Sequence, residues 1–113
     1  MLNLAKKTAI VSGGSKGIGK AIAMKLSQAG ANVVICSRRK ENLDSAVIEA
    51  ESNGLTLIPI ECNTSNKESI QSVVDHTIEK FDKVDVLVNN AAANPYYCLL
   101  YTFRAHETLR YLV

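Results

Sequence analysis

The chain has little net charge, few cysteines and no long apolar run. Its 13 basic and 11 acidic residues leave a formal charge of +2, too small for general binding to nucleic acid or an anionic membrane. Its cysteines number three, an odd count without paired spacing, which argues against a disulfide framework and indicates reduced thiols. No apolar run approaches the roughly 20 residues that cross a bilayer, and the N-terminus lacks the apolar stretch of a secretory signal. We therefore expect a cytoplasmic protein that binds neither nucleic acid nor membrane.

What the sequence does contain is an alternation of short apolar runs and helical patterns. The 113 residues, 47% of them hydrophobic, are enough for one globular domain. The apolar runs are residues 8–12, 32–37, 55–61 and 84–90. Strands with little polar alternation, separated by helices, predict right-handed β-α-β units and a parallel sheet that is covered on both faces. The predicted fold class is α/β, a doubly wound parallel sheet of about four strands.

Several residues mark the ends of the predicted elements. Gly30 and Gly54 follow the first two helical patterns, where a glycine commonly ends a helix. Ser65 and Glu68 have the spacing of a capping box, which predicts that the third helix starts at Ser65. Pro59 lies within the third apolar run, and a proline is tolerated mainly in a strand at the edge of a sheet.

The turn after the first strand has four glycines in ten residues, "VSGGSKGIGK" at 11–20. In a doubly wound sheet this turn brings a helix N-terminus, with its unpaired amides and partial positive charge, to the crevice where ligands bind. Gly13 would allow the tight turn, Gly17 the close approach of a pyrophosphate, and Gly19 close packing of the helix on the strand. The spacing and position favour a dinucleotide site over a purely structural turn.

The end of the second strand favours one dinucleotide over the other. In such folds an acidic residue here binds the ribose 2′-hydroxyl of NAD, whereas an arginine accommodates the 2′-phosphate of NADP. The strand ends in "CSRRK", with Arg38 and Arg39, and the next acidic residue is Glu41. Lys16 in the glycine loop would add a second cation. The alternative is that Arg38 to Lys40 only begin a solvated helix, although positive charge there opposes the helix dipole. The sequence thus favours NADP(H) over NAD(H).

These motifs resemble those of the short-chain dehydrogenase/reductase family. "SGGSKGIG" (12–19) is similar to the T-G-x-x-x-G-x-G motif of that family, and "VDVLVNNAA" (84–92) to its D-x-L-V-N-N-A-G strand. The "SRR" that ends the second strand resembles the NADP-preferring carbonyl-reductase and tropinone-reductase-like branch. The resemblance covers residues 5 to about 97, which is under half of a typical family member. It implies the strand order 3-2-1-4, with Pro59 in the edge strand.

The resemblance also implies a role for individual residues in binding the cofactor. Ser15, Lys16 and Ile18 would contact the ribose and phosphates, and Arg38, with Arg39 beside it, the 2′-phosphate. Asn63 stands where the family has an aspartate that accepts a hydrogen bond from the adenine amino group. Asn90 and Ala91 would flank the nicotinamide ribose. The predicted cofactor-binding residues are therefore Gly13, Ser15, Lys16, Gly17, Ile18, Gly19, Arg38, Arg39, Asn63, Asn90 and Ala91.

The proton-transfer residues of the family have no counterpart in the sequence. Family members reduce a carbonyl or oxidise an alcohol with a tyrosine whose phenol is activated by a lysine four residues later. Here the last lysine is Lys83 and the first tyrosine is Tyr96, so no Y-x-x-x-K exists and no catalytic residue is predicted. We interpret residues 1–97 as a dinucleotide-binding half and 98–113 as an atypical tail, with a helix from about Thr102 as one alternative. This predicts a truncated product, a variant reading frame or a fragment that needs a partner.

Other reactive side chains carry weaker signals. His76 and His106 have no metal-ligand spacing with cysteine or with each other, and no metal site is predicted. Cys36 and Cys62 end neighbouring strands in the implied order and would lie close together, as buried free thiols.

Three interpretations of function stay open at this stage. The first is an NADP(H)-binding oxidoreductase chain that does not turn over in the 113-residue form, with a small carbonyl or alcohol substrate only if the missing half is supplied. The second is a non-catalytic nucleotide-binding or regulatory module that pairs with a full-length relative. The third is a doubly wound domain without a ligand. The apolar fourth strand would be an exposed edge, which favours a homo- or hetero-oligomer formed through it.

Overall fold

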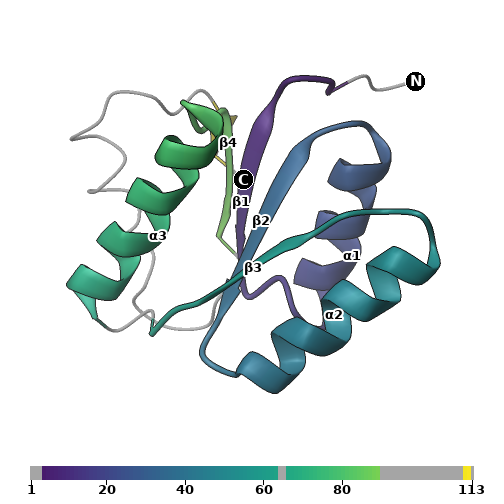
Figure 1. The fold of residues 1–113 in the computed structure, drawn as a ribbon, viewed down its shortest axis with the longest axis horizontal. Coiled ribbons are helices and arrows are strands. Elements are labelled where there is room, and N and C mark those ends of the chain that lie inside the picture. Colours follow the sequence, from purple (N-terminus) through teal and green to yellow (C-terminus); the bar gives the residue numbers. More distant parts are fainter. Residues whose placement is uncertain (1–3, 64–65, 90–110, 113) are drawn as a thin grey trace.

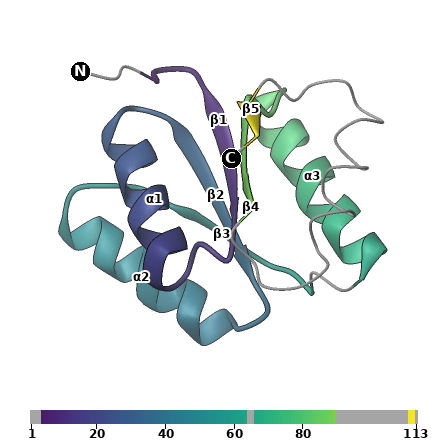
Figure 2. The same cartoon turned by 180° about the vertical axis from the view of Figure 1, so that it is seen from behind.

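Strands and helices alternate along the chain, as the sequence predicts. The computed structural model describes residues 4–63, 66–89 and 111–112. The elements are β1 (Thr8–Ser12), α1 (Gly17–Gln28), β2 (Asn32–Ser37), α2 (Lys40–Ser52), β3 (Ile58–Glu61), α3 (Lys67–Phe81), β4 (Val86–Asn89) and β5 (Tyr111–Leu112). The strand pairs of this described part are parallel, in the order β3-β2-β1-β4-β5. Helices α1 and α2 cover one face of the sheet and α3 the other (Figures 1 and 2). The doubly wound fold and the order 3-2-1-4 are confirmed, with Pro59 in the edge strand β3.

The two faces of the sheet have separate hydrophobic cores. Ala9 and Val11 of β1 pack in the cluster that α1 and α2 cover, while Ile10 between them belongs to the cluster under α3. All five residues of β1 are buried. Because a central parallel strand is covered on both sides, its sequence needs apolar residues at every position, which is why no polar alternation is seen.

Two helix ends follow the prediction, and one helix start does not. Gly30 and Gly54 have φ of 102° and 73° and lie just beyond α1 and α2. Helix α3, however, begins at Lys67, with Asn66 as its N-cap; the Asn66 side chain accepts hydrogen bonds from the amides of Glu68 and Ser69. The predicted cap, Ser65, lies outside the described residues. No helix in the described ranges is long and apolar enough to span a membrane.

Two strands are shorter than their apolar runs. β3 begins at Ile58 rather than at residue 55, because the Leu55 amide still donates to the Ala50 carbonyl (2.8 Å) at the end of α2. β4, described as Val86–Asn89, begins at Val86 rather than at residue 84, because Asp85 before it is held by other bonds. The Asp85 carboxylate accepts from the Thr8 amide at 2.9 Å and lies 3.3 Å from the Lys83 ammonium group, and its own amide donates to the Thr8 carbonyl at 2.8 Å. This buried aspartate, which the sequence analysis missed, fastens β1 to the start of β4.

The far edge of the sheet also differs from the prediction. Residues 111–112 form the short strand β5, parallel to β4, and not part of a helix. The edge of β4 is therefore paired at Val86 and Leu87, where its open backbone groups find partners. The rest of the predicted tail, 98–110, lies outside the described residues, so the division at residue 97 stays a prediction.

Candidate nucleotide-binding site

The glycine loop joins the end of β1 to the start of α1. Gly13 has φ of 71°, and its amide donates to the Cys36 carbonyl at 2.9 Å, so the chain turns while still bonded to β2. Gly17, the first residue of α1, has φ of 53°, and a Cβ there would meet nothing within 4 Å. A left-handed conformation with open space above it suits a glycine against which a ligand packs. Gly19 is buried in α1.

Gly14 is a residue of the loop whose role the sequence analysis missed. A Cβ at this position would lie 2.6 Å from Ile35 Cγ2 and 3.1 Å from the Val11 carbonyl oxygen. A side chain is therefore excluded by packing against β2. The sequence did contain a signal for this role, because two glycines stand together at 13–14. The tight turn requires a glycine only at Gly13, so a second glycine at 14 calls for another reason.

The N-terminus of α1 is open to a ligand. The amides of a helix's first turn have no partner within the helix and need one elsewhere. The N-cap of α1 is Lys16, which makes no side-chain capping bond, and the first turn contains no acidic residue. Ser15 is buried, Lys16 is exposed, and Ile18 is an exposed apolar side chain at 72%. Helix α3, by contrast, is capped by Asn66. The amides of α1 thus remain for an external anion.

A pocket lies at the carboxyl ends of β2 and β3, the same end of the sheet at which α1 begins. Its volume is about 390 Å³. The residues that line it are Arg38, Glu61, Cys62, Asn63 and Ser69. Two residues that the sequence assigns to the same cofactor, Arg38 and Asn63, therefore share one pocket. The sequence analysis missed Glu61, Cys62 and Ser69 as its walls, although Glu61 and Cys62 directly precede Asn63.

Hydrogen bonds fix the wall formed by Asn63 and leave Arg38 at the solvent. The backbone amide of Asn63 donates to Ser69 Oγ at 3.0 Å, which ties the segment after β3 to the first turn of α3. Arg38, Arg39 and Lys40 are exposed, and the Arg39 amide donates to Ser37 Oγ at 3.4 Å before α2 begins. Arg39 is the N-cap of α2 and makes no side-chain capping bond. The positive charge of this segment therefore faces solvent at the pocket.

The thiol of Cys62 in this pocket interacts with that of Cys36. The Cys36 thiol lowers the pKa of Cys62 to about 7, against the opposing effect of burial, and the Ser69 hydroxyl also lowers it. The contact with Cys62 raises the pKa of Cys36, and burial raises it further. Both cysteines are free and buried, as predicted, and they lie close together. The described residues include no group of three or more metal-ligating side chains.

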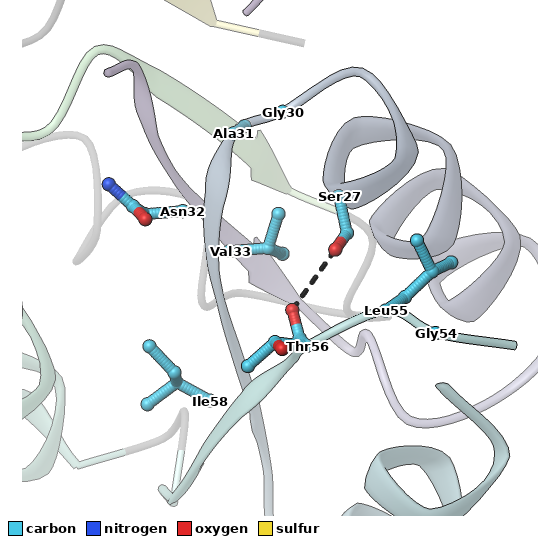
Figure 3. A pocket seen from close by; sticks show the side chains of 9 residues that line it. All are labelled: Ser27, Gly30, Ala31, Asn32, Val33, Gly54, Leu55, Thr56 and Ile58. Atoms are coloured by element: carbon cyan, nitrogen blue, oxygen red, sulfur yellow. Dashed lines mark hydrogen bonds between the residues drawn. The ribbon is translucent and has the colours of Figure 1, made fainter. Parts of the chain in front are cut away.

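A second cavity lies at the opposite end of the sheet. It measures about 230 Å³ and is drawn in Figure 3. Its lining residues are Ser27, Gly30, Ala31, Asn32, Val33, Gly54, Leu55, Thr56 and Ile58. Across it Ser27 Oγ donates to the Thr56 carbonyl at 3.1 Å. In open α/β sheets ligands bind beyond the carboxyl ends of the strands, and this cavity lies at the amino end of β2. We therefore place the site at the Arg38 pocket.

The residues of the carboxyl end fit a dinucleotide. The open space above Gly17 and the uncapped start of α1 suit a diphosphate. The exposed guanidinium of Arg38 suits a further phosphate. The side-chain carboxamide of Asn63 suits a base. The two remaining predicted residues, Asn90 and Ala91, lie outside the described residues. Asn89, the last described residue before them, pairs with Ser12 at the carboxyl end of β1.

Comparison with known proteins agrees with this arrangement. A family model described as short chain dehydrogenase matches residues 7–105. The chain is 44% identical over 89 residues to tropinone reductase-like 3 of Erythroxylum coca, covering 79% of this chain and 34% of that protein. It is 38% identical over 94 residues to dehydrogenase/reductase SDR family member 4 of Rattus norvegicus, covering 83% and 34%. The chain thus spans about a third of the length of these curated relatives.

Solved structures give the same result. A metagenomic short-chain oxidoreductase in complex with NADP has a TM-score of 0.83 and 29% identity, covering 90% of this chain and 57% of that one. An actinorhodin polyketide ketoreductase variant with NADPH has a TM-score of 0.73 and 33% identity, covering 80% and 35%. The glycine loop, the strand order and the matched residues lead to one conclusion: the chain belongs to the short-chain dehydrogenase family of oxidoreductases.

Proposed function

We propose that this chain binds NADP(H) in the Arg38 pocket and along the glycine loop, as the nucleotide-binding part of an oxidoreductase for small carbonyl or alcohol substrates. The observation that carries the proposal is that Arg38 and Asn63 line one pocket, at the same end of the sheet as the uncapped start of α1. The complexes with NADP and NADPH among the similar structures support it. When bound, the cofactor would supply or accept the hydride.

Each part of the site has a proposed role. The amides of the glycine loop, at Gly13, Ser15, Lys16, Gly17, Ile18 and Gly19, hold the diphosphate and its ribose. The guanidinium of Arg38, with Arg39 next to it, binds the 2′-phosphate by charge-assisted hydrogen bonds. The side-chain oxygen of Asn63 accepts from the adenine amino group, and Asn90 and Ala91 flank the nicotinamide ribose. Glu61 also lines the pocket and is exposed, so solvent screens its repulsion of the phosphate.

We further propose that residues 1–97 act as this nucleotide-binding unit and that the 113-residue chain binds cofactor without turnover. A tyrosine phenol titrates near pH ~10 and needs a neighbouring lysine to act at neutral pH. With Lys83 before Tyr96, the sequence contains no Y-x-x-x-K to provide this pair. The free thiols Cys36 and Cys62 support a reducing compartment, and we propose the cytoplasm.

A second candidate function is a non-catalytic module that pairs with a longer relative. It is favoured by the edge of β4, where, in the described part of the chain, β5 pairs with Val86 and Leu87 and not along the whole strand. A strand from a partner would satisfy the remaining backbone groups. Size-exclusion chromatography of the chain with and without a full-length relative tests this; elution of the two as separate monomers excludes it.

Calorimetric or fluorescence titration with NADPH and NADH tests the main proposal. We expect saturable binding of both, with NADPH the tighter ligand. Equal affinities would contradict the role of Arg38, and no binding of either would contradict the dinucleotide site as a whole. Incubation with NADPH and a panel of ketones tests the absence of turnover, which any steady oxidation of NADPH contradicts.

A further inference from the structure

Two cysteines lie together at the carboxyl ends of β2 and β3. Cys36 lies opposite Ile60 in the β2–β3 pairing, and the Cys62 amide, just after β3, donates to the Ser37 carbonyl at 2.8 Å. Both side chains belong to the hydrophobic cluster beneath α3. The proposed binding of NADP(H) does not use either thiol, so their chemistry is a separate question.

The two cysteines are about equally covered, but only Cys62 lines the pocket. Cys36 is 1% exposed, and its Sγ lies 3.9 Å from the Val11 carbonyl oxygen, in the interior between β1 and β2. Cys62 is also nearly covered, at 2%, but it lines the 390 Å³ pocket with Arg38 and Asn63. Of the two cysteines, Cys62 is therefore the one next to the pocket that a small reagent would enter.

The surroundings shift the pKa values of the two thiols in opposite directions. Cys36 keeps its proton, because the contact with Cys62 and burial both raise its pKa. Cys62 has a pKa of about 7, lowered by Cys36 and then by Ser69. The charged groups that line the pocket are Arg38 and Glu61, of opposite sign. The lowered pKa favours the thiolate of Cys62, which is the reactive form of cysteine.

We propose that Cys62 is a site of oxidation by hydroperoxides, and that bound NADP(H) shields it. The Cys62 thiolate attacks the terminal oxygen of the hydroperoxide; an S–O bond forms, the O–O bond breaks, and the leaving hydroxide or alkoxide is protonated by a buffer acid. The sulfur is oxidised by two electrons to a sulfenic acid, and the peroxide is reduced. The shielding rests on the proposed function, because it requires that the nucleotide occupy the Arg38 pocket.

The strand register argues against a disulfide as the product. Cys36 is opposite Ile60, so Cys62 lies diagonally across, two residues further along. With strands ~4.8 Å apart and a rise of ~3.3 Å per residue, the two Cα atoms are about 8 Å apart. An unstrained disulfide needs about 4.4–6.8 Å. Cys36 is therefore poorly placed to form a disulfide, and we assign it a positioning role beside Cys62, whose pKa it lowers.

Peroxide labelling of the 113-residue chain tests the inference. The chain is treated with H₂O₂ at pH 7 in the presence of dimedone and then unfolded in iodoacetamide, and each cysteine peptide is measured by mass spectrometry. We expect the dimedone adduct on Cys62 well before any on Cys36, and about tenfold slower labelling at NADPH ten times above its Kd. No adduct on Cys62, or a Cys36–Cys62 disulfide as the main product, overturns the inference.

Two variants separate positioning from mere packing. Cys36→Ala should raise the pH of half-maximal Cys62 labelling by about one unit, whereas Cys36→Ser keeps a hydroxyl donor and should restore most of the original profile. Identical pH profiles for the two variants and the parent would overturn the positioning role.

NADPH binding measured in the same samples distinguishes this inference from the proposed function. If NADPH does not bind while Cys62 is still labelled, the proposed function and the shielding fail and the oxidation site stands. If NADPH binds without slowing the labelling, the shielding alone is wrong.

Discussion

Each end of the sheet has a cavity, and the two ends differ in chemistry. Helices α1 and α2 end at the amino ends of the strands. The last carbonyls of each helix accept hydrogen bonds from the amides that directly follow the same helix. The amides of Gly30 and Ala31 donate to the carbonyls of Ser27 and Leu26, and those of Gly54 and Leu55 to Glu51 and Ala50. At the carboxyl ends α1 begins with no side-chain cap. The backbone groups available to a ligand are therefore at the carboxyl end.

The charges show the same contrast. Asp85, near the amino end of β4, is 2% exposed and is bonded to the Thr8 amide and to Lys83. Arg38 at the carboxyl end is exposed and lines a pocket. The inward charge, that of Asp85, stabilises the fold, whereas the outward charge, that of Arg38, faces solvent. A cavity alone thus does not identify a binding site; uncommitted hydrogen-bonding groups and charge do.

The largest expected effect is that of removing the inward charge. Asp85→Ala leaves the buried Thr8 amide without its acceptor and should lower the free energy of unfolding by about 3 kcal/mol. Asp85→Asn keeps an acceptor oxygen and should cost clearly less. Urea denaturation measures both. NADPH affinity of the folded protein should not change, and a loss of affinity in Asp85→Asn would mean that the two ends are not separate in function.

Reversing the outward charge should have the opposite pattern. Arg38→Asp removes a charge-assisted contact with the 2′-phosphate and adds repulsion, so NADPH affinity should fall about 100-fold while NADH affinity holds or improves. Lys25→Asp makes the same change of charge in the last turn of α1 and is the matched control. Titration of both variants with both nucleotides is the measurement. An equal loss in the two variants would reduce the effect to net charge.

Two glycines offer a pair of matched substitutions at opposite ends. Gly17 and Gly54 both have positive φ, and a Cβ at either meets nothing within 4 Å. Gly17→Ala and Gly54→Ala should therefore each lose about 1 kcal/mol of stability. Only Gly17→Ala should also weaken NADPH binding, by about tenfold, because its methyl group enters the space above the loop. Equal NADPH affinity in the two variants would show that no diphosphate lies there.

The sequence predicted what depends on repeated patterns and missed what depends on single contacts. Apolar runs and helix periodicity are spread over many residues, so they predicted the α/β fold, whereas the strand order was implied by the family resemblance. The cap at Asn66, the bonds of Asp85 and the steric need for Gly14 each depend on one three-dimensional neighbour. In the candidate site, Arg38 was assigned because it directly follows β2, and Asn63 because the family resemblance implies an adenine contact there; both line the pocket. Ser69 was missed because α3 brings it to the pocket from six residues beyond Asn63.

The smallest expected effect is at the adenine end of the pocket. Asn63→Asp introduces the residue that the family usually has, and a charged acceptor binds the adenine amino group more strongly than a neutral one. Because position 63 is exposed, we expect only about a threefold gain in affinity for both nucleotides. Competition between NADPH and NADH before and after the change measures it. A gain for NADH with a loss for NADPH would instead place residue 63 beside the 2′-phosphate, in direct contact with the ligand group that Arg38 is proposed to bind.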